Sequence, residues 1–382
     1  MRRGAMGLPV VGMVGGGQLS RMTHQAAISL GLSLRVLADA THDSAALVAN
    51  GVVVGSHESL DDLRAFAEGC EVVTFDHEHV PGPLIEALEQ EHRVFPSSAA
   101  LRHAQDKLVM RERLSALGAP VPPFTPVATR ADVEGFGRHV GWPLVLKAAS
   151  GGYDGKGVWV VADLDEADEV LRSGVRLLAE EKVPLRRELA AVVARSPYGQ
   201  AAAWPVVETV QSDGICVEVV APAPDLDEDR ALEAQDLALR LADALDVVGV
   251  LAVELFDLGD RLVVNELAMR PHNSAHWTIE GSRTSQFEQH VRAVLDYPLG
   301  ETRTTAPWVV MANLLGGEGD PDLDRRMHLL MGRDPGLKVH LYGKEVRPGR
   351  KIGHVTALGD DLDDVRRRAQ VGAHWLRTGE WL

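Results

Sequence analysis

The segment PLVLKAASGGYDGKGVWVVA, residues 143–162, carries the strongest indication of the fold. Two apolar runs with the pattern of strands flank a loop that has four glycines in residues 151–157, and Lys147 lies near the end of the first run. Glycine lets a backbone adopt positive φ and approach a ligand closely. A strand, a glycine loop and a second strand form a flap suited to cover nucleotide phosphates, whereas a P-loop leads into a helix. A purely structural hairpin with a surface lysine is the alternative.

The composition is that of a soluble chain with two or three domains. It has 382 residues, a formal net charge of −16 and two cysteines, Cys70 and Cys216, both within apolar runs. The negative charge argues against sequence-independent nucleic-acid binding, so an anionic substrate needs a local cationic pocket. The cysteines lack metal-ligand spacing and are expected to be reduced and structural. There is no export signal and no run of 18 apolar residues, so we expect a cytoplasmic protein without a membrane span.

The order of apolar runs divides the chain into three segments. Residues 1–105 alternate strand-like and helical stretches, which predicts parallel βαβ units in a doubly wound sheet. Residues 106–300 contain a small α/β lid at about 124–189, and the strands after it have short connections that predict a mostly antiparallel sheet. Residues 301–382 return to strands, and we expect them to pack on that sheet. We also expect one helix over residues 97–120.

A second glycine turn lies near the N-terminus, in VVGMVGGGQLSRM at residues 10–22. A strand ends there and a helix begins, and the N-terminus of a helix after a glycine turn favours a phosphate. The spacing of Gly12, Gly15 and Gly17, with Asp39 further on, is not a clean dinucleotide fingerprint. The pattern therefore favours phosphate binding of some kind, with a structural tight turn as the alternative.

Two glutamates, Glu254 and Glu266, lie twelve residues apart on either side of a turn at Gly259 and Asp260. A hairpin with a three-residue loop would place both carboxylates opposite each other on one face. Carboxylates in apolar strands repel unless a cation lies between them, and Mg²⁺ is the expected partner. An acid/base pair for glycoside hydrolysis and solvated strand carboxylates are the alternatives.

Two polar clusters follow this hairpin. Arg270, His272, Asn273 and His276 come directly after it, and such a cluster could bind an oxyanion and stabilise its charge. The pair of histidines lacks the glutamate of a zinc HExxH motif, so zinc is disfavoured. The segment GKEVRPGRKIGHV, residues 343–355, concentrates positive charge in an acidic chain and favours an anion site over a solvated patch. Its basic residues are Lys344, Arg347, Arg350, Lys351 and His354.

Taken together, these features resemble the ATP-grasp ligases. Within them, GGGQLSRM, SGGYDGKG, NELAMRPHNSAHW and KEVRPGRKIGH are similar, in the same order, to motifs of the N5-carboxyaminoimidazole ribonucleotide synthetases. The resemblance covers essentially the whole chain. It implies an α/β (α+β) protein with an ATP-grasp fold, in which a Rossmann-like pre-ATP-grasp domain precedes a small lid domain and a C-terminal antiparallel sheet domain.

The resemblance also implies an activity. Members of that family use ATP and Mg²⁺ to activate bicarbonate as carboxyphosphate, and then carboxylate the exocyclic amine of 5-aminoimidazole ribonucleotide. The implied partners are these small molecules, without nucleic acid or membrane, and the implied assembly is a homodimer.

Site residues follow from the resemblance, motif by motif. It implies Glu254 and Glu266 as magnesium ligands. Those implied for ATP are Lys107, Lys147, Gly152, Tyr153, Asp154, Gly155, Lys156, Gly157, Val158, Glu180, Glu181, Lys182, Val183, Glu188, Gln211, Asn265 and Glu266. Those implied for catalysis on bicarbonate and the acceptor are Arg270, His272, Asn273, Tyr153, Asp154, Lys156, Lys344 and Lys351. Those implied for the acceptor nucleotide are Gly16, Gly17, Gln18, Leu19, Glu78, Arg347 and Arg350.

This chain departs from the family pattern at several positions. Lys156 stands where relatives usually have arginine. Lysine keeps the positive charge but lacks the planar guanidinium that can bind an oxyanion through two hydrogen bonds. Gln211 stands where relatives often have histidine, and His77 replaces an apolar residue. Competing interpretations are another ATP-grasp ligase, such as a formate-dependent glycinamide ribonucleotide transformylase or a biotin-dependent carboxylase subunit, and a degenerate nucleotide-binding regulator. A nicotinamide dehydrogenase would leave the facing glutamates unexplained.

Overall fold

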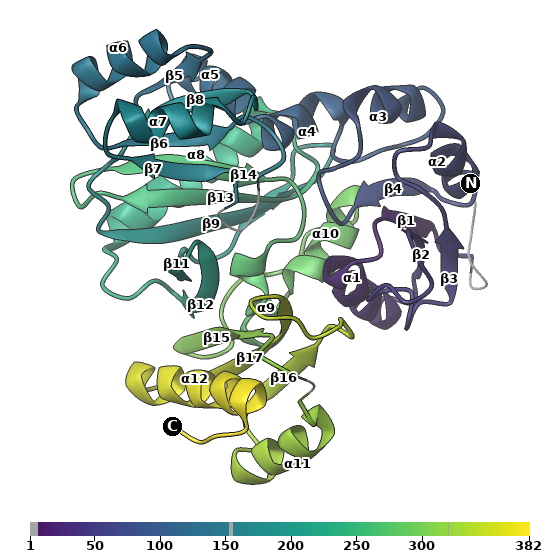
Figure 1. Ribbon diagram of the computed structural model, residues 1–382. Coiled ribbons are helices and arrows are strands. Elements are labelled where there is room, and N and C mark those ends of the chain that lie inside the picture. The colour runs from purple at the N-terminus through teal and green to yellow at the C-terminus, as the bar shows by residue number, and fades with distance from the viewer. Residues whose placement is uncertain (1–6, 153–155, 320) are drawn as a thin grey trace.

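In the computed structural model, which describes residues 7–152, 156–319 and 321–382, the N-terminal segment forms a parallel four-stranded sheet (Figure 1). The strand order is β3-β2-β1-β4, and every pairing is parallel. Helix α1 packs against one face through Leu19 and Met22, while α2 and α3 cover the other, so the predicted doubly wound arrangement is confirmed. The elements are β1 (Val10–Val14), α1 (Gln18–Ser29), β2 (Ser33–Ala38), β3 (Gly51–Val54), α2 (Leu60–Ala67), β4 (Val72–Phe75) and α3 (Gly82–Glu89).

The single helix predicted over residues 97–120 is wrong, because the chain breaks into α4 (Ser98–Gln105) and α5 (Lys107–Ala116). Asp106 lies between them in an extended conformation, and its carboxylate accepts hydrogen bonds from the amides of Leu108 and Val109, each at 3.0 Å. It is therefore an N-cap, which satisfies amide groups that the helix itself leaves unpaired. As a consequence Lys107 becomes the first residue of α5, and its backbone amide donates to the Ala149 carbonyl at 2.7 Å.

The lid is a four-stranded antiparallel sheet of order β5-β8-β6-β7 with two helices on it. Lys147 on β6 pairs with Val158 on β7, which confirms the predicted strand, glycine loop and strand. Helix α6 begins with a capping box between Thr129 and Asp132. The elements are β5 (Phe124–Val127), α6 (Arg130–Val140), β6 (Leu144–Ala148), β7 (Val158–Val161), α7 (Leu164–Leu171) and β8 (Leu177–Glu181).

A nine-stranded sheet forms the largest part of the molecule. Its order is β14-β13-β9-β11-β12-β15-β17-β16, with β10 paired to β9. The C-terminal strands join this sheet through β12 and β15, and α12 packs beneath them (Figure 1). The strands are β9 (Arg187–Arg195), β10 (Ala201–Ala203), β11 (Val207–Ser212), β12 (Ile215–Ala221), β13 (Gly249–Asp257), β14 (Leu262–Ala268), β15 (Trp308–Leu315), β16 (Lys338–Leu341) and β17 (Lys351–Gly359). The helices are α8 (Glu228–Ala244), the 3₁₀ turn η1 (Asn273–Ala275), α9 (Thr278–Gly281), α10 (Gln286–Val294), α11 (Leu323–Arg333) and α12 (Leu362–Thr378).

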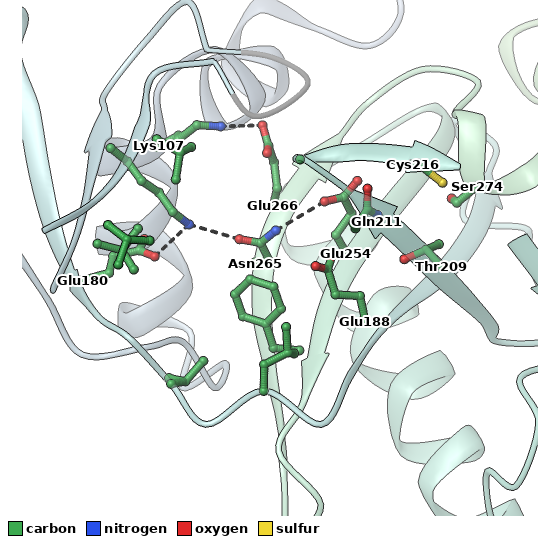
Figure 2. A pocket seen from close by; sticks show the side chains of 18 of the residues that line it. Lys107, Glu180, Glu188, Thr209, Gln211, Cys216, Glu254, Asn265, Glu266 and Ser274 are labelled. Atoms are coloured by element: carbon green, nitrogen blue, oxygen red, sulfur yellow. Dashed lines mark hydrogen bonds and ion pairs between the residues drawn. The ribbon is translucent and has the colours of Figure 1, made fainter. Parts of the chain in front are cut away.

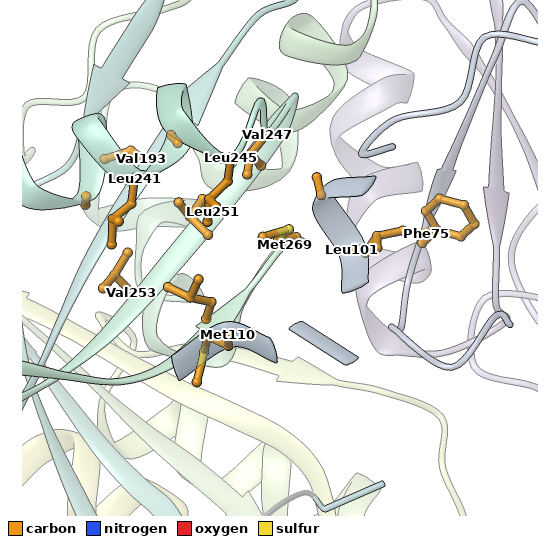
Figure 3. Close-up of a cluster of buried hydrophobic side chains, with 14 of the residues drawn as sticks. Phe75, Leu101, Met110, Val193, Leu241, Leu245, Val247, Leu251, Val253 and Met269 are labelled. Carbon is orange, nitrogen blue, oxygen red and sulfur yellow. The ribbon is translucent and has the colours of Figure 1, made fainter. Parts of the chain in front are cut away.

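One hydrophobic core joins the N-terminal sheet to the large sheet. Figure 3 shows Phe75 from β4 and Leu101 from α4 on one side of this cluster, with Met110 from α5 and Leu251 from β13 further along it. Met269, which follows β14, belongs to the same cluster and is fully buried. Tight packing of this kind fixes the relative position of the elements that carry it. Among the helices of the described residues, none combines the length and the hydropathy needed to cross a bilayer.

Candidate active site

The hairpin of β13 and β14 places Glu254 directly opposite Glu266, as predicted. The predicted three-residue loop is wrong, because the loop comprises the four residues 258–261. The odd residue lies instead in a bulge, where Leu255 pairs with Val264 and Asn265 is inserted before Glu266. In an uninterrupted ladder Asn265 would face Glu254 and Glu266 would point to the other side of the sheet. The bulge therefore brings all three polar side chains to one face, as Figure 2 shows.

The electrostatics of this face favour a cation. Burial, together with the neighbouring carboxylates of Glu266 and Glu188, raises the pKa of Glu254 to about 7. Lys107 donates to Glu266, with 2.5 Å between Nζ and Oε1, and offsets part of the negative charge. Two carboxylates that face each other, with the ionisation of Glu254 opposed by its surroundings, are a donor set suited to Mg²⁺. Among the described residues no group of three or more His, Cys, Asp or Glu side chains is arranged for metal binding.

A buried ionic triad supports the hairpin from the lid side. Glu180 on β8 accepts from Lys147 at 2.8 Å and from Arg111 Nε at 2.7 Å. Burial opposes ionisation of Glu180, but the two cations outweigh it and lower its pKa to about 2. Lys147 also donates to Asn265 Oδ1 at 3.0 Å, and Arg111 Nη2 donates to the Asn265 carbonyl at 2.8 Å. Both cations thus hold the bulge as well as the lid strand.

A cavity of about 610 Å³ lies between the lid and the large sheet. Its apolar lining includes Val145, Val160 and Phe256, and its polar lining includes most residues predicted for ATP (Figure 2). Gly152 lines a different cavity, while Lys156 and Gly157 line neither. The residues predicted for ATP that line the first cavity are Lys107, Lys147, Val158, Glu180, Glu181, Lys182, Val183, Glu188, Gln211, Asn265 and Glu266.

A second cavity, of about 620 Å³, lies between the N-terminal domain and the large sheet. Gln18, Leu19, Glu78, Arg270 and Lys344 line it, together with residues 150–152 of the glycine loop. Within the described part of the chain, five residues line both cavities, so the two spaces meet there. These shared residues are Glu254, Glu266, His272, Asn273 and Lys351.

His272 is a neutral hydrogen-bond donor at this junction. Its Nδ1 accepts from the Ser274 amide at 3.4 Å and lies 2.8 Å from Ser274 Oγ, which leaves the proton of the neutral ring on Nε2. Nε2 lies 3.5 Å from Glu254 Oε1. Burial, reinforced by Arg270 and Lys351, lowers the pKa of His272 to about 3. The ring can therefore donate to an anion without carrying a charge at neutral pH.

The neighbours of His272 are also held in place. Asn273 and Asn313 exchange two amide hydrogen bonds, at 3.0 and 2.8 Å. Glu78 accepts from the Met269 amide at 2.9 Å and from Arg270 Nε at 3.1 Å. Glu78 therefore orients Arg270 besides lining the second cavity.

At the N-terminal glycine turn, Gly17 is the N-cap of α1, and Asp76 Oδ2 accepts from the Ser20 amide at 3.3 Å. A Cβ on Gly17 would lie 2.6 Å from that oxygen, so the carboxylate requires glycine here. Lys344 contacts Gln18 Oε1, which brings the C-terminal segment to this turn. Gly16 and Gly17 themselves do not line the second cavity.

Several predicted residues are not brought to the two cavities. Arg347 and Arg350 lie outside both, and the guanidinium of Arg347 binds the Glu345 carboxylate while Arg350 Nη1 donates to the Glu345 carbonyl. Tyr153, Asp154 and Gly155 lie outside the described residues. Arg111 was not among the predicted residues, because its partner Glu180 comes 69 residues later and the sequence around Arg111 gives no local signal of burial.

Three family models match this chain. They are the ribonucleotide synthetase preATP-grasp domain over residues 8–105, the ATP-grasp domain over 112–287, and the phosphoribosylaminoimidazole carboxylase C-terminal domain over 309–368.

Curated relatives and solved structures agree with these models. The N5-carboxyaminoimidazole ribonucleotide synthase of Mycobacterium tuberculosis is 58% identical over 381 residues, covering 98% of this chain and 89% of that protein. The corresponding protein of Corynebacterium ammoniagenes is 49% identical, covering 98% and 94%. The synthetase structure from Thermus thermophilus has a TM-score of 0.87 at 39% identity, covering 96% and 98%. A structure from Aspergillus clavatus in complex with ADP and 5-aminoimidazole ribonucleotide has a TM-score of 0.88 at 33% identity, with the same coverage.

Proposed function

The chain belongs to the family of N5-carboxyaminoimidazole ribonucleotide synthases, ATP-dependent ligases of the ATP-grasp superfamily, and we propose that it carboxylates 5-aminoimidazole ribonucleotide where its two cavities meet. The products are N5-carboxyaminoimidazole ribonucleotide, ADP and phosphate, in a step of purine biosynthesis. One observation supports this proposal above all: a nucleotide-sized cavity meets a second cavity at five shared residues. The reaction needs such an arrangement, because ATP and the acceptor must both approach one bicarbonate.

ATP would occupy the first cavity. Its base would lie among the apolar side chains near Glu181 to Val183, where strand β8 ends at the edge of the lid. Glu188, whose pKa is raised by burial, faces the same space and suits ribose hydroxyls. Lys107 and Lys147 supply positive charge for the phosphates, and the glycine loop would cover them.

Mg²⁺ fits the facing carboxylates, and Glu254 and Glu266 would hold it with Asn265 beside them. When bound, the ion neutralises charge on the nucleotide phosphates. The protein's own part is to keep the two carboxylates on one face through the bulge, and to hold Asn265 through Lys147 and Arg111.

Arg270, His272 and Asn273 would bind bicarbonate, with Lys351 close by. A bicarbonate oxygen attacks the γ-phosphorus, the bond from that phosphorus to the β-γ bridging oxygen breaks, and ADP leaves. The amine of the acceptor then attacks the carbon of carboxyphosphate, the bond from carbon to the bridging oxygen breaks, and phosphate leaves with that oxygen while the nitrogen loses a proton. Hydrogen bonds from Arg270 and His272 Nε2 would stabilise the charge that develops on these oxygens.

The acceptor nucleotide would occupy the second cavity, between Gln18 and Leu19 on one side and Lys344 on the other. Tyr153, Asp154 and Lys156 remain proposed contributors from the glycine loop, and Gly16, Gly17, Arg347 and Arg350 remain proposed contacts. The homodimer is likewise a prediction from the family, which sedimentation of the purified protein would check.

The direct test is ADP release by the purified protein with ATP, Mg²⁺ and bicarbonate, measured with and without 5-aminoimidazole ribonucleotide. We expect that nucleotide to stimulate ADP release and to become carboxylated. Stimulation by formate with glycinamide ribonucleotide, and not by the aminoimidazole nucleotide, would assign the chain to the rival transformylase. No stimulated ADP release with either pair would favour a regulator.

A further inference from the structure

Gln286, the first residue of α10, is completely buried and holds the backbone of His272 in both directions. The His272 amide donates to Gln286 Oε1 at 2.7 Å, and Gln286 Nε2 donates to the His272 carbonyl at 2.8 Å. The two backbone groups fix which end of the side-chain amide is oxygen and which is nitrogen. This residue was not among the predicted site residues, and it lines neither cavity.

The same amide nitrogen also donates to His276 Nδ1, at 3.0 Å. His276 therefore carries its proton on Nε2 when neutral, and burial lowers its pKa well below the usual value. His276 lines the second cavity. Gln286 thus ties together the two histidines that flank the 3₁₀ turn η1.

Helix α10 is itself firmly anchored. His290, one turn after Gln286, accepts from the Val250 amide on β13 at 3.2 Å, and its Nε2 lies 2.8 Å from Thr74 Oγ1 on β4. The backbone amide of Gln286 donates to Thr278 Oγ1 at 2.9 Å. The Gln286 side chain therefore projects from an element that is fixed to both the large sheet and the N-terminal sheet.

We propose that Gln286 is a positioning residue, which sets the place of the His272 ring relative to Glu254 for bicarbonate activation. The proposal rests on the proposed function, since it assumes that His272 binds bicarbonate. His272 Nε2 lies 3.5 Å from Glu254 Oε1, and a change in the His272 backbone moves that nitrogen directly. Small displacements of a binding group reduce the rate of a step that depends on alignment.

Gln289 provides a matched control on the same helix. It is also completely buried, and its amide makes the same pair of backbone hydrogen bonds, to the Gly300 amide at 2.7 Å and the Gly300 carbonyl at 2.8 Å. Neither Gln289 nor Gly300 lines either cavity. A purely structural glutamine clamp should therefore behave in the same way at both positions.

The experiment compares Gln286→Met with Gln289→Met, because methionine is unbranched, similar in size and unable to replace the amide. For Gln286→Met we expect kcat to fall roughly 10- to 100-fold and KM for bicarbonate to rise, with KM for ATP within about twofold of wild type. For Gln289→Met we expect kcat and the KM for bicarbonate to stay within about twofold of wild type. Thermal unfolding of the two variants should show similar losses, so that stability does not explain the difference.

Equal kinetic loss in the two variants, or an unchanged kcat and bicarbonate KM in Gln286→Met, would overturn the proposal. If Gln286→Met does not fold, Gln286→Glu keeps the acceptor for the His272 amide and donates only when protonated. Its activity relative to wild type should then rise as pH falls, and a pH-independent ratio would overturn the proposal. Wild-type protein without nucleotide-stimulated ADP release would instead refute the proposed function.

Discussion

At the scale of single residues, the insertion of Asn265 determines which way Glu266 faces. The bulge lets two successive side chains of β14 point to the face that carries Glu254, and Lys147 and Arg111 hold it through the amide and the carbonyl of Asn265. The sequence indicated the glutamate pair from its spacing. It did not indicate the bulge, because a three-residue loop and a four-residue loop with a bulge give the same pairing of Glu254 with Glu266.

The role of this pair is testable by replacing Glu266 with glutamine, which keeps the shape and removes the charge. We expect turnover to fall roughly 100-fold or more, since one of the two carboxylates of the proposed magnesium site is lost. Steady-state ADP release at saturating ATP and Mg²⁺ measures the effect. Asp260→Asn, an exposed carboxylate in the loop of the same hairpin, is the control and should retain wild-type turnover. A near-wild-type rate for Glu266→Gln would remove the hairpin from the reaction.

Arg111 marks the limit of prediction at this scale. Its side chain is 1% exposed, yet the sequence around it reads as an ordinary charged helix face. Burial of an arginine becomes favourable only through a partner, and here both partners, Glu180 and the Asn265 carbonyl, are distant in sequence. Lys147 and the glutamates were predictable because they lie in motifs, whereas a buried cation without a motif was not.

At the scale of elements, α10 joins the large sheet to the N-terminal sheet through His290. The imidazole bridges Val250 on β13 and Thr74 on β4, and Gly249 lies so close that a Cβ there would meet the ring at 2.8 Å. Burial lowers the pKa of His290 to about 4. The folded protein therefore keeps this ring neutral at pH values where an unfolded chain, with a histidine pKa near 6.5, is already protonated.

The sign of the resulting pH effect follows from proton binding. Between pH 6.5 and 4 the unfolded state binds the extra proton, so His290 makes stability fall as pH falls, by about 1.4 kcal/mol per pH unit. His290→Gln removes this proton uptake, and the stability of that variant should depend less steeply on pH within this window. Denaturant midpoints measured from pH 7 to 4.5 test this, with His139→Gln, exposed on α6, as the control. If the stability of His290→Gln fell with pH as steeply as that of the wild type, the His290 ring would not be held neutral in the folded protein.

Elements differed in how far the sequence defined them. Alternating apolar runs predicted the parallel sheet, the lid strands and the hairpin, because those patterns repeat over many residues. The break at Asp106 was missed, since aspartate is tolerated within helices and only its two hydrogen bonds to the next amides reveal a cap. That break matters for the site, because it directs Lys107 toward Glu266.

At the scale of the whole molecule, the site is assembled from segments that are far apart in sequence. The glycine turn of residues 15–19 meets Lys344, Glu78 meets Arg270, and the core of Figure 3 holds the N-terminal sheet against the large sheet. The lid closes the first cavity, and the N-terminal domain closes the second. The order of the motifs in the sequence predicted which segments contribute to the site. It could not predict that five residues would line both cavities, since this depends on how the domains pack against one another.

The most direct test of the central claim follows an oxygen atom from bicarbonate into the released phosphate. If bicarbonate is phosphorylated and then attacked by the amine, one of its oxygens leaves with phosphate. With ¹⁸O-labelled bicarbonate, ATP, Mg²⁺ and 5-aminoimidazole ribonucleotide, we therefore expect one labelled oxygen in each phosphate, measured by mass spectrometry at short times. A parallel reaction in labelled water with unlabelled bicarbonate corrects for exchange. Carboxylated product accompanied by unlabelled phosphate would contradict the account.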